Sequence, residues 1–473
     1  MGKGICQVFT PKDIVREMLD RVGYTTQLYG KKILENSCGE GAFLGEIVIR
    51  YIIDGRNRGL SSEQIKKGLE SDIKGVEKDE ECYRKCMLNL QSIAYTYGIT
   101  NVKWNLVQTD ALKTIIQNEY DYVVGNPPYI TYYNLSTEER KYIVEHFATC
   151  KKGKPDYYYA FTEAAICSLK PGGKLAYLIP NNFMKNRFSQ ELRNYLSPHM
   201  EKLIDYRDHK IFKDYLTSSA IIICEKNTNK AFFEYVDIPN ENILSIEKKE
   251  LKNKWAFYLP EVTEKMVRFG DIFQVSAPVA TLLNAAFVLE NVEEENEKYA
   301  VTGGVWLEKE LLRVAASPKT KQKQKGKTYI IFPYKYAQGK RESYNEEDLK
   351  KNYPKIYAYL LKNKSKLLER KSDKKCKWFE YGRTQALDHI NQEKILLSTL
   401  ITDKVRHYRL DKEEVPFSGM YIIPRGERNL EEAEQILNSK EFMEYVREIG
   451  ISVSGNSYRI SPSDVENYMV RIV

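Results

Sequence analysis

The sequence contains no long apolar run, and this absence excludes a membrane-spanning helix. Its 473 residues are 42% hydrophobic and 29% charged, with a mean hydropathy of −0.52, whereas a span needs about 20 mostly apolar residues in succession. The first nine residues also lack the charged head and apolar stretch of a signal peptide. We therefore expect a cytoplasmic protein with two or three domains, since a domain usually holds roughly 100–200 residues.

The eight cysteines form no paired framework. Cys82 and Cys86 lie four residues apart in a charged, helix-like stretch, and no second pair of Cys or His residues would complete a zinc site with them. We therefore predict reduced thiols, as in other cytosolic proteins, and no bound metal.

Positive charge is concentrated in one segment of the chain. Between Pro318 and Lys377, 19 Lys or Arg residues accompany 6 Asp or Glu residues, a local net charge of +13, so the rest of a chain with net charge +8 sums to −5. This segment is also rich in tyrosine, and the combination suits a phosphate backbone. On charge alone, a solvated lysine-rich surface fits equally well.

The first half of the chain alternates short apolar runs with longer amphipathic stretches. This alternation predicts an α/β fold with a mostly parallel, doubly wound sheet, in which ligands lie beyond the carboxyl ends of the strands. The alternation fades near residue 240, so residues 1–240 are predicted as one domain and residues 245–473 as a second, mixed α+β domain. Expected strands cover 32–35, 73–77, 102–107, 120–124, 174–179, 202–205 and 220–224, expected helices cover 42–53, 80–97 and 157–169, and an exposed basic loop is expected at 319–327.

A glycine turn follows the first expected strand, in residues 34–43 (LENSCGEGAF). Gly39 and Gly41 would let the backbone approach a ligand closely, and the helix that follows offers free N–H groups. Glu35, at the strand end, places a carboxylate beside the turn, which suits an ammonium group better than a pyrophosphate. The turn therefore favours a zwitterionic cofactor over a dinucleotide, although an ordinary tight turn would explain the glycines alone.

Acidic residues also follow the next two expected strands. Glu77 can accept hydrogen bonds from both hydroxyls of a ribose, and Asp110, which precedes Ala111, can accept one from the amino group of an adenine. Either acid could instead cap a helix. Three successive strand ends with suitable groups favour a bound nucleoside.

The most specific motif is Asn126–Tyr129 (NPPY), directly after the strand expected at 120–124. The prolines fix the backbone, so the Asn126 side chain and the Pro127 carbonyl can both accept hydrogen bonds from one amino group. Tyr129 offers a flat face to a planar ring. Two acceptors would draw an exocyclic amine towards tetrahedral geometry and localise its lone pair, so that the amine attacks without prior deprotonation. A rigid proline turn is the alternative interpretation.

The order and content of these motifs resemble the N6-adenine DNA methyltransferases, in the group with gamma-type motif order, whose target-recognition domain follows the catalytic motif. Residues 7–11 (QVFTP) resemble the N-terminal cofactor motif of this family, residues 155–161 (PDYYYAF) resemble the next segment, and residues 180–193 resemble the segment that supplies a second aromatic side chain to the target base. The resemblance covers nearly the whole chain, because residues 276–281, 330–334, 377–383 and 455–460 look like the target-recognition domain of restriction-modification methyltransferases. Many relatives have Gly at 278 or 280, and Pro or Ala at 37 or 38, where this chain departs from the pattern.

The resemblance implies a Rossmann-like catalytic domain that binds S-adenosylmethionine and methylates N6 of an adenine flipped out of double-stranded DNA. It also implies a monomer, and a cognate restriction endonuclease would act at the same site. The implied cofactor contacts are Thr10, Glu35, Gly39, Gly41, Glu77, Asp110, Ala111 and Phe161. The implied catalytic residues are Asn126, Pro127, Pro128, Tyr129 and Phe188, with Phe183 as the competing candidate for Phe188. The candidate DNA contacts are Arg383, Asn456 and Arg459, each of which could instead be a structural or surface residue.

Three other functions share part of this pattern. Methyltransferases that act on ribosomal RNA or on protein glutamine use the same four-residue motif, but they usually lack a basic C-terminal domain of this size. A fused restriction enzyme needs a nuclease segment, for which a cofactor motif that begins at residue 7 leaves no room, so we expect no magnesium-dependent DNA cleavage. A non-catalytic DNA-binding specificity module would not retain the acidic residues of the three strand ends together with Asn126.

Overall fold

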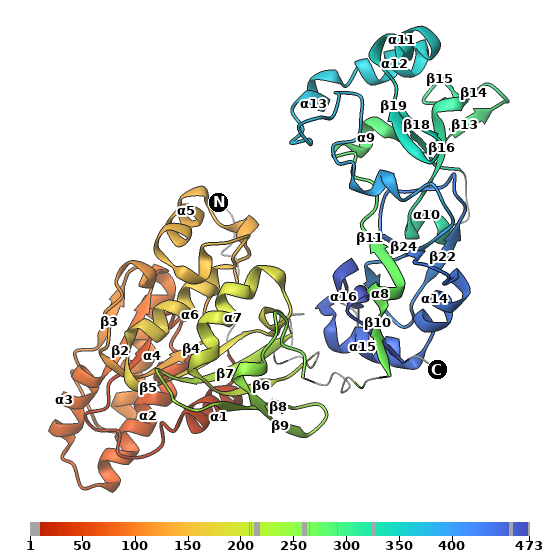
Figure 1. Cartoon of the computed structure of the whole chain (residues 1–473). Coiled ribbons are helices and arrows are strands. Elements are labelled where there is room, and N and C mark those ends of the chain that lie inside the picture. The colour runs from red at the N-terminus through yellow and green to blue at the C-terminus, as the bar shows by residue number, and fades with distance from the viewer. Residues whose placement is uncertain are drawn as a thin grey trace. The chain divides into compact units, whose positions relative to one another are not determined.

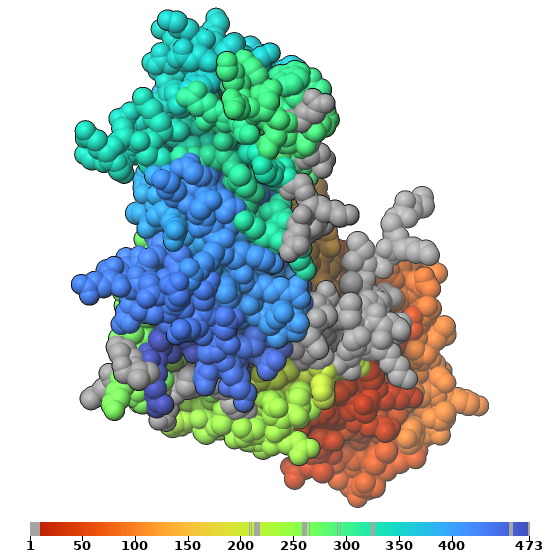
Figure 2. All heavy atoms as spheres, turned by 90° about the vertical axis from the view of Figure 1, so that its right-hand side faces the viewer, coloured from red at the N-terminus to blue at the C-terminus, as the bar shows by residue number. Residues whose placement is uncertain are grey.

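The computed structural model describes residues 10–207, 209, 211, 218–257, 263, 265–290, 292–323, 327–453 and 457–471. The chain divides into two compact units, Met1–Phe257 and Tyr258–Val473. The first unit is coloured red to yellow-green and the second green to blue, both in the cartoon of Figure 1 and in the space-filling view of Figure 2.

A nine-stranded sheet, in the order β3-β2-β1-β4-β5-β7-β6-β8-β9, forms the centre of the first unit. The first five strands in that order run parallel to one another, and β7 runs antiparallel to both of its neighbours. The predicted Rossmann-like α/β fold with a mostly parallel sheet is therefore confirmed. The strands are β1 (Ile33–Glu35), β2 (Ile73–Glu77), β3 (Asn105–Gln108), β4 (Tyr120–Gly125), β5 (Leu169–Pro180), β6 (Met200–Asp205), β7 (Ser219–Glu225), β8 (Phe232–Asp237) and β9 (Asn242–Glu247).

Helices cover both faces of this sheet. They are α1 (Lys12–Val22), α2 (Ala42–Asn57), α3 (Ser62–Asp72), α4 (Glu80–Thr96), α5 (Thr137–His146), α6 (Tyr157–Ser168) and α7 (Gln190–Leu196). The strand order runs outward from β1 to β3 on one side and from β4 to β5 on the other, so right-handed connections place α2 and α6 on opposite faces (Figure 1). The carboxyl ends of β1 and β4 thus meet where the strand order reverses, the usual ligand position in such sheets. Among the described residues, no helix is both long and apolar enough to cross a membrane.

Helices α3 and α5 were not among the helices expected from the apolar pattern, but their first turns carry a recognisable signal. In each, a serine side chain accepts a hydrogen bond from the backbone of the residue three positions later, whose own side chain bonds back. These capping boxes, Ser61 with Gln64 and Ser136 with Glu139, fix the start of each helix. The sequence pattern S-x-x-E/Q would have predicted both helix starts.

The second unit contains small sheets of two to four strands, interspersed with short helices (Figure 1). Its buried core includes the rings of Phe287, Phe332, Tyr334 and Tyr381, which pack edge to face. The predicted mixed α+β architecture is confirmed. The helices are α8 (Phe269–Ile272), α9 (Asn284–Phe287), α10 (Pro318–Lys323), α11 (Glu346–Asn352), α12 (Pro354–Leu361), α13 (Lys364–Leu368), α14 (Leu430–Leu437), α15 (Lys440–Ile449) and α16 (Pro462–Glu466).

The strands of the second unit are mostly two to five residues long, too short to give the regular alternation that marks the first unit. They are β10 (Met266–Arg268), β11 (Phe273–Ser276), β12 (Val288–Leu289), β13 (Val292–Glu295), β14 (Tyr299–Thr302), β15 (Val305–Glu308), β16 (Leu312–Ala316), β17 (Tyr329–Ile331), β18 (Tyr334–Ala337), β19 (Lys340–Ser343), β20 (Lys394–Leu397), β21 (Leu400–Ile401), β22 (His407–Leu410), β23 (Val415–Pro416), β24 (Met420–Pro424), β25 (Ile451–Val453), β26 (Ser457–Arg459) and β27 (Met469–Arg471).

The structure differs from two expectations about organisation. Strand β8 pairs with β6 and β9 pairs with β8, so the first unit's sheet continues past residue 240, and the units divide after Phe257. The basic loop expected at 319–327 instead begins as helix α10. There, Ser317 Oγ accepts a hydrogen bond from Thr320 N–H at 3.0 Å, which caps the first turn.

Candidate active site

A cavity of about 650 Å³ lies at the carboxyl ends of β1, β2 and β4. Its volume is within the range of small-molecule sites in proteins. Among the predicted site residues of the first unit, Gly41 and the two competing aromatics Phe183 and Phe188 do not line it. The cavity brings together Thr10, Glu35, Gly39, Glu77, Asp110, Ala111, Asn126, Pro127, Pro128, Tyr129 and Phe161. Residues 7–9 of the N-terminal motif lie outside the described residues.

The glycine turn between β1 and α2 has the backbone that only glycine adopts easily. Gly39 has φ +53° and Gly41 has φ +89°. A Cβ on Gly41 would lie 2.8 Å from the Cys86 Sγ atom, whereas a Cβ on Gly39 would meet nothing within 4 Å. Gly41 thus permits the close contact of this turn with α4, and Gly39 lies at the cavity.

We predict that Gly41→Ala destabilises the protein more than Gly39→Ala does. Both substitutions strain a left-handed backbone, at about 1–2 kcal/mol each. Gly41→Ala also forces a contact on buried Cys86, so its total loss should reach roughly 2–4 kcal/mol. Urea unfolding of the two variants without cofactor measures the difference. Equal losses would contradict the close packing of the turn against α4.

The Glu77 carboxylate holds the backbone around the glycine turn. Its Oε2 accepts a hydrogen bond from Gly39 N–H at 2.8 Å. Its Oε1 accepts hydrogen bonds from Lys78 N–H at 2.9 Å and from Asp79 N–H at 2.8 Å. Asp79, and not Glu77, caps α4 by accepting a hydrogen bond from Cys82 N–H. The helix-cap alternative is therefore wrong for Glu77.

Asp110 does cap a helix, a short 3-10 turn. Its Oδ1 accepts a hydrogen bond from Leu112 N–H at 3.1 Å, at the start of η1 (Ala111–Lys113). Its Oδ2 lies 3.6 Å from the Lys78 ammonium, which also lies 3.4 Å from Glu139 Oε1. Lys78 and Glu139 both line the cavity, and neither was among the predicted site residues. The capping box of α5 places Glu139 there.

Glu35 is buried at the end of β1. Its Oε2 accepts a hydrogen bond from Leu44 N–H at 3.1 Å. Burial raises the pKa of Glu35 well above its usual range, and the neighbouring Cys86 thiol and Glu77 carboxylate raise it further. A positively charged group in the cavity would stabilise the Glu35 carboxylate and so lower its pKa again.

The Asn126–Tyr129 motif follows β4 and is anchored on both sides. Asn126 Nδ2 donates a hydrogen bond to Thr10 Oγ1 at 3.2 Å, and Ser37 Oγ donates one to Asn126 O at 3.3 Å. Tyr129 donates its hydroxyl proton to Leu178 O at 2.8 Å. Burial raises the Tyr129 pKa well above its usual range, so the ring stays neutral. These contacts orient the motif relative to β1 and β5.

Aromatic side chains differ in their access to solvent and cavity. Phe161 lines the cavity beside Tyr157, with ring centroids 5.3 Å apart. Phe183 is fully buried and packs edge to face on Trp255 at 5.8 Å. Phe188, in η5 (Arg187–Ser189), is 38% exposed and lies outside the cavity. Of the two competing aromatics, Phe188 has the accessible ring.

The three candidate DNA contacts lie in the second unit. Arg383 Nη1 pairs with Asp373 Oδ1 at 2.9 Å, and both side chains are partly exposed. Arg459 lies exposed on β26 (Ser457–Arg459). Asn456 lies outside the described residues.

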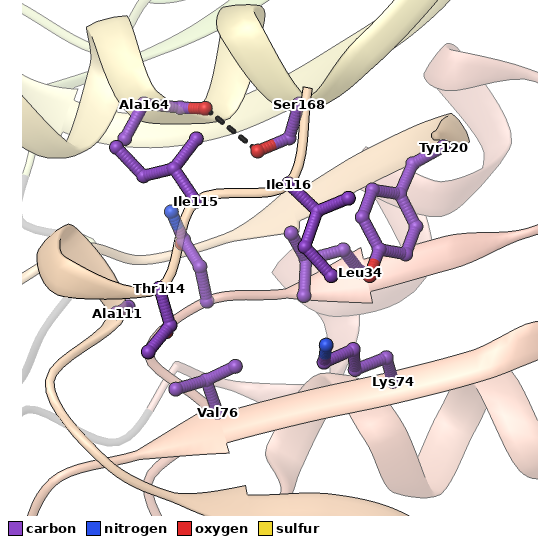
Figure 3. A pocket seen from close by; sticks show the side chains of 11 residues that line it. Leu34, Lys74, Val76, Ala111, Thr114, Ile115, Ile116, Tyr120, Ala164 and Ser168 are labelled. Carbon is purple, nitrogen blue, oxygen red and sulfur yellow. Dashed lines mark hydrogen bonds between the residues drawn. The ribbon is translucent and has the colours of Figure 1, made fainter. Parts of the chain in front are cut away.

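A second, much smaller cavity lies against β1 and β2, beside the segment after η1 (Figure 3). Its walls include Leu34, Val76, Ile115 and Ile116, and its volume is about 20 Å³. That volume holds about one water molecule, so this cavity is too small for a substrate or cofactor.

Comparisons with known proteins relate this chain to restriction-modification enzymes. Residues 49–212 match the Eco57I restriction-modification methylase family. The type II restriction enzyme and methyltransferase RM.Eco57I of Escherichia coli is 24% identical over 85% of this chain and 49% of its own length. The type II methyltransferase M.BstVI of Geobacillus stearothermophilus is 28% identical over 47% of this chain and 42% of its own. The chain thus spans about half the length of these curated relatives.

The fold is also similar to that of a solved structure. The type IIL restriction-modification enzyme MmeI, determined in complex with DNA, covers 97% of this chain and 66% of its own, with a TM-score of 0.55 and 13% sequence identity. Together with the Eco57I methylase match, these findings confirm the predicted resemblance to restriction-modification methyltransferases.

Proposed function

We propose that this chain is a site-specific DNA methyltransferase of a restriction-modification system, which transfers a methyl group from S-adenosylmethionine to N6 of a flipped-out adenine. One observation carries the proposal: the Asn126–Tyr129 motif lines the same cavity as the acidic residues at the ends of β1 and β2. The Eco57I methylase match and the relatives' names support methyl transfer.

The cavity residues fit S-adenosylmethionine, which supplies an electrophilic methyl group on a sulfonium. Buried Glu35 would receive the ammonium of the methionine end, and Phe161 would pack on the adenine. Glu77 already accepts hydrogen bonds from three backbone N–H groups. It would also accept hydrogen bonds from the ribose hydroxyls, because a carboxylate has about four acceptor sites. Because Asp110 caps the helix through its Oδ1, its Oδ2 faces Lys78. This oxygen would accept a hydrogen bond from the adenine amino group.

We predict that affinity for S-adenosylmethionine rises with pH and that Glu35→Gln removes this rise. Because its pKa is raised, Glu35 is protonated in the free protein up to that pKa. The ammonium of the cofactor binds the ionised form of Glu35. At a pH below the Glu35 pKa, cofactor binding therefore releases the Glu35 proton, and the affinity increases as the pH increases. The rise should hold until the cofactor's amino group loses its own proton, near pH 7.7–8 for an ordinary α-amine.

Calorimetric titrations at several pH values, in buffers of different ionisation enthalpy, would measure both the affinity and the proton release. Asp79→Asn serves as the control, because Asp79 also lines the cavity but its pKa is lowered by the α4 cap. A pH-independent affinity in the unaltered protein would contradict the contact between Glu35 and the ammonium.

The motif residues would activate the target amine. The Asn126 side chain and the Pro127 carbonyl would accept hydrogen bonds from its two N–H groups and so localise the nitrogen lone pair for attack on the methyl group. As the N–C bond forms, the methyl–sulfur bond would break with its electron pair left on sulfur, and the product nitrogen would then lose one proton. A nucleophile held in line with a good leaving group needs mainly orientation and a water-free site. Tyr129 and Phe188 would pack on the flipped base, whose extrusion costs a few kcal/mol of stacking.

The second unit would bind double-stranded DNA and select the sequence, with Lys and Arg on phosphates and polar side chains on base edges. Two observations support this role. The segment Pro318–Lys377 of the second unit carries a net charge of +13, and the structure of MmeI was determined in complex with DNA. In this proposal residues 1–240 and the β8-β9 hairpin belong to the catalytic part, and the rest from about residue 258 forms the specificity part. A cognate endonuclease would cleave the same sequence when it is unmethylated.

The test of this function offers three substrates side by side. The purified chain is incubated with methyl-labelled S-adenosylmethionine and equal masses of unmethylated genomic DNA, ribosomal RNA or a cell protein extract. Label in DNA is the expected result. Label confined to RNA or protein would contradict the proposed substrate.

A further inference from the structure

Three segments of the first unit meet beside the catalytic motif and present lysines together with exposed aromatic rings. They are η2 (Tyr132–Asn134), the loop 151–154 and η5 (Arg187–Ser189). We call the set formed by Lys151, Lys152, Lys154, Tyr133 and Phe188 the basic–aromatic rim. The large cavity reaches Ile130, three residues before Tyr133, so the rim begins where the proposed target site ends.

Direct contacts hold the three segments together. Gly153 has φ +78°, and a Cβ at this position would lie 2.4 Å from Phe188 Cδ1, so the glycine lets the loop lie directly on that ring. The Lys154 ammonium lies 4.5 Å from the centroid of the Tyr133 ring and also contacts its hydroxyl. Lys152 Nζ lies 2.8 Å from Glu191 Oε1, at the start of α7. The rim is therefore one surface rather than three separate loops.

The support beneath the rim fixes the Tyr133 backbone. Arg140, on α5, donates hydrogen bonds to Tyr132 O at 2.8 Å and to Tyr133 O at 2.6 Å. Asp156 Oδ1 accepts a hydrogen bond from Tyr132 N–H at 3.2 Å. These bonds hold η2 in place, while the Tyr133 ring itself remains 68% exposed.

The charges of the rim are available to an anion. Within the part of the chain that the structure describes, Lys151 and Lys154 make no ion pair with a carboxylate. Lys151 Nζ instead donates to Glu145 O at 3.0 Å. The ion pair of Lys152 with Glu191 is mostly exposed on the lysine side, and exposed pairs contribute little. A phosphate could replace Glu191 as the partner of Lys152 at small cost.

We propose that the basic–aromatic rim binds the sugar-phosphate backbone of the target strand next to the flipped nucleotide. Its lysines would contact the phosphates, and Tyr133 would pack on a base that flipping has left unstacked. Lysines that follow a backbone, combined with aromatic faces for unstacked bases, are the usual features of sites for single-stranded nucleic acid. The inference rests on the proposed function, because it names a further contact of the same substrate.

The first test removes charge from the rim of the full-length protein. Lys152→Gln/Lys154→Gln is compared with Lys66→Gln/Lys67→Gln, which removes two lysines from α3. Binding is measured by fluorescence anisotropy over a series of KCl concentrations. The probe is a labelled, unmethylated duplex that contains the sequence that the protein methylates. We expect the rim variant to bind several-fold more weakly. The slope of log affinity against log salt should become shallower by about 1.8, at roughly 0.9 per lost phosphate contact. The α3 variant should have the same DNA affinity and the same salt slope as the unaltered protein.

The second test removes a ring. Tyr133→Ala is compared with Tyr95→Ala on α4, since the two tyrosines are 68% and 72% exposed. Base stacking is worth about 1–3 kcal/mol, so Tyr133→Ala should weaken binding at least about fivefold, without changing the salt slope. Tyr95→Ala should leave binding unchanged.

The outcomes separate this inference from the proposed function. If the protein methylates DNA but the rim variants bind like their controls, the rim proposal is wrong and the function stands. If no DNA is methylated, a mixed-sequence duplex replaces the methylated sequence. A shallower slope in the rim variant then shows that the rim contacts DNA phosphates although the proposed reaction is wrong, and an unchanged slope contradicts the phosphate contacts as well.

Discussion

Asn126→Ala should lower kcat for methyl transfer by roughly 100- to 1,000-fold or more, with the dissociation constant of S-adenosylmethionine nearly unchanged. In the proposed mechanism, the substitution removes a hydrogen-bond acceptor for the target amine, and this hydrogen bond is needed in the transition state. The groups proposed to bind the cofactor, Glu35 and Glu77, lie on other strands. Single-turnover rates and calorimetric titration of the cofactor measure the two quantities separately.

Asn134→Ala provides the matched control, because Asn134 is an exposed asparagine of η2 in the same stretch of chain. It should keep normal turnover. Normal turnover in Asn126→Ala itself would eliminate the proposed role of the motif. A large loss of cofactor affinity in that variant would show that its hydrogen bond with Thr10 shapes the cofactor site instead.

Glu77→Ala should weaken S-adenosylmethionine binding by at least about 100-fold and also lower the free energy of unfolding. The carboxylate accepts three backbone hydrogen bonds that fix the glycine turn and the end of β2. Hydrogen bonds to charged groups contribute about 1.5–3 kcal/mol each, and a 100-fold affinity change corresponds to about 2.7 kcal/mol. Calorimetry and urea unfolding measure the two effects.

Glu81→Ala is the control for charge, because Glu81 lines the same cavity but its side chain is largely exposed and pairs with Lys85. It should bind the cofactor normally. Glu77→Gln keeps an acceptor oxygen, so its affinity for the cofactor should lie between those of Glu77→Ala and Glu81→Ala. Unaltered cofactor binding in Glu77→Ala would mean that the turn forms without this carboxylate and that the ribose contact does not exist.

The sequence predicted those parts of the fold in which local pattern and burial agree. Strand β2 has the predicted bounds, and the glycine turn, Glu77 and Asn126 all line one cavity. Strands buried on both faces read as apolar runs, and glycines with positive φ mark the turn that follows β1. Strand order then places their carboxyl ends together.

Other features depend on contacts between distant segments and left no local signal. Strand β9 (Asn242–Glu247) is an edge strand whose side chains are all exposed or half-buried, so its sequence shows no clear alternation of buried and exposed positions. The contact of Lys78 with both Asp110 and Glu139 joins three elements that are far apart in sequence. The choice between Phe183 and Phe188 depends on packing against Trp255, which lies at the far end of the unit's sequence.

The most direct test of the central claim identifies the methylated nucleoside. DNA labelled by the purified chain with S-adenosylmethionine is digested to nucleosides, which are separated and identified by mass spectrometry. The account predicts that the label is found in N6-methyladenine, and sequencing of the modified sites would then give the recognition sequence. Label in N4-methylcytosine would contradict the assignment of adenine, and an absence of label from DNA in a protein that still binds the cofactor would contradict the proposed reaction as a whole.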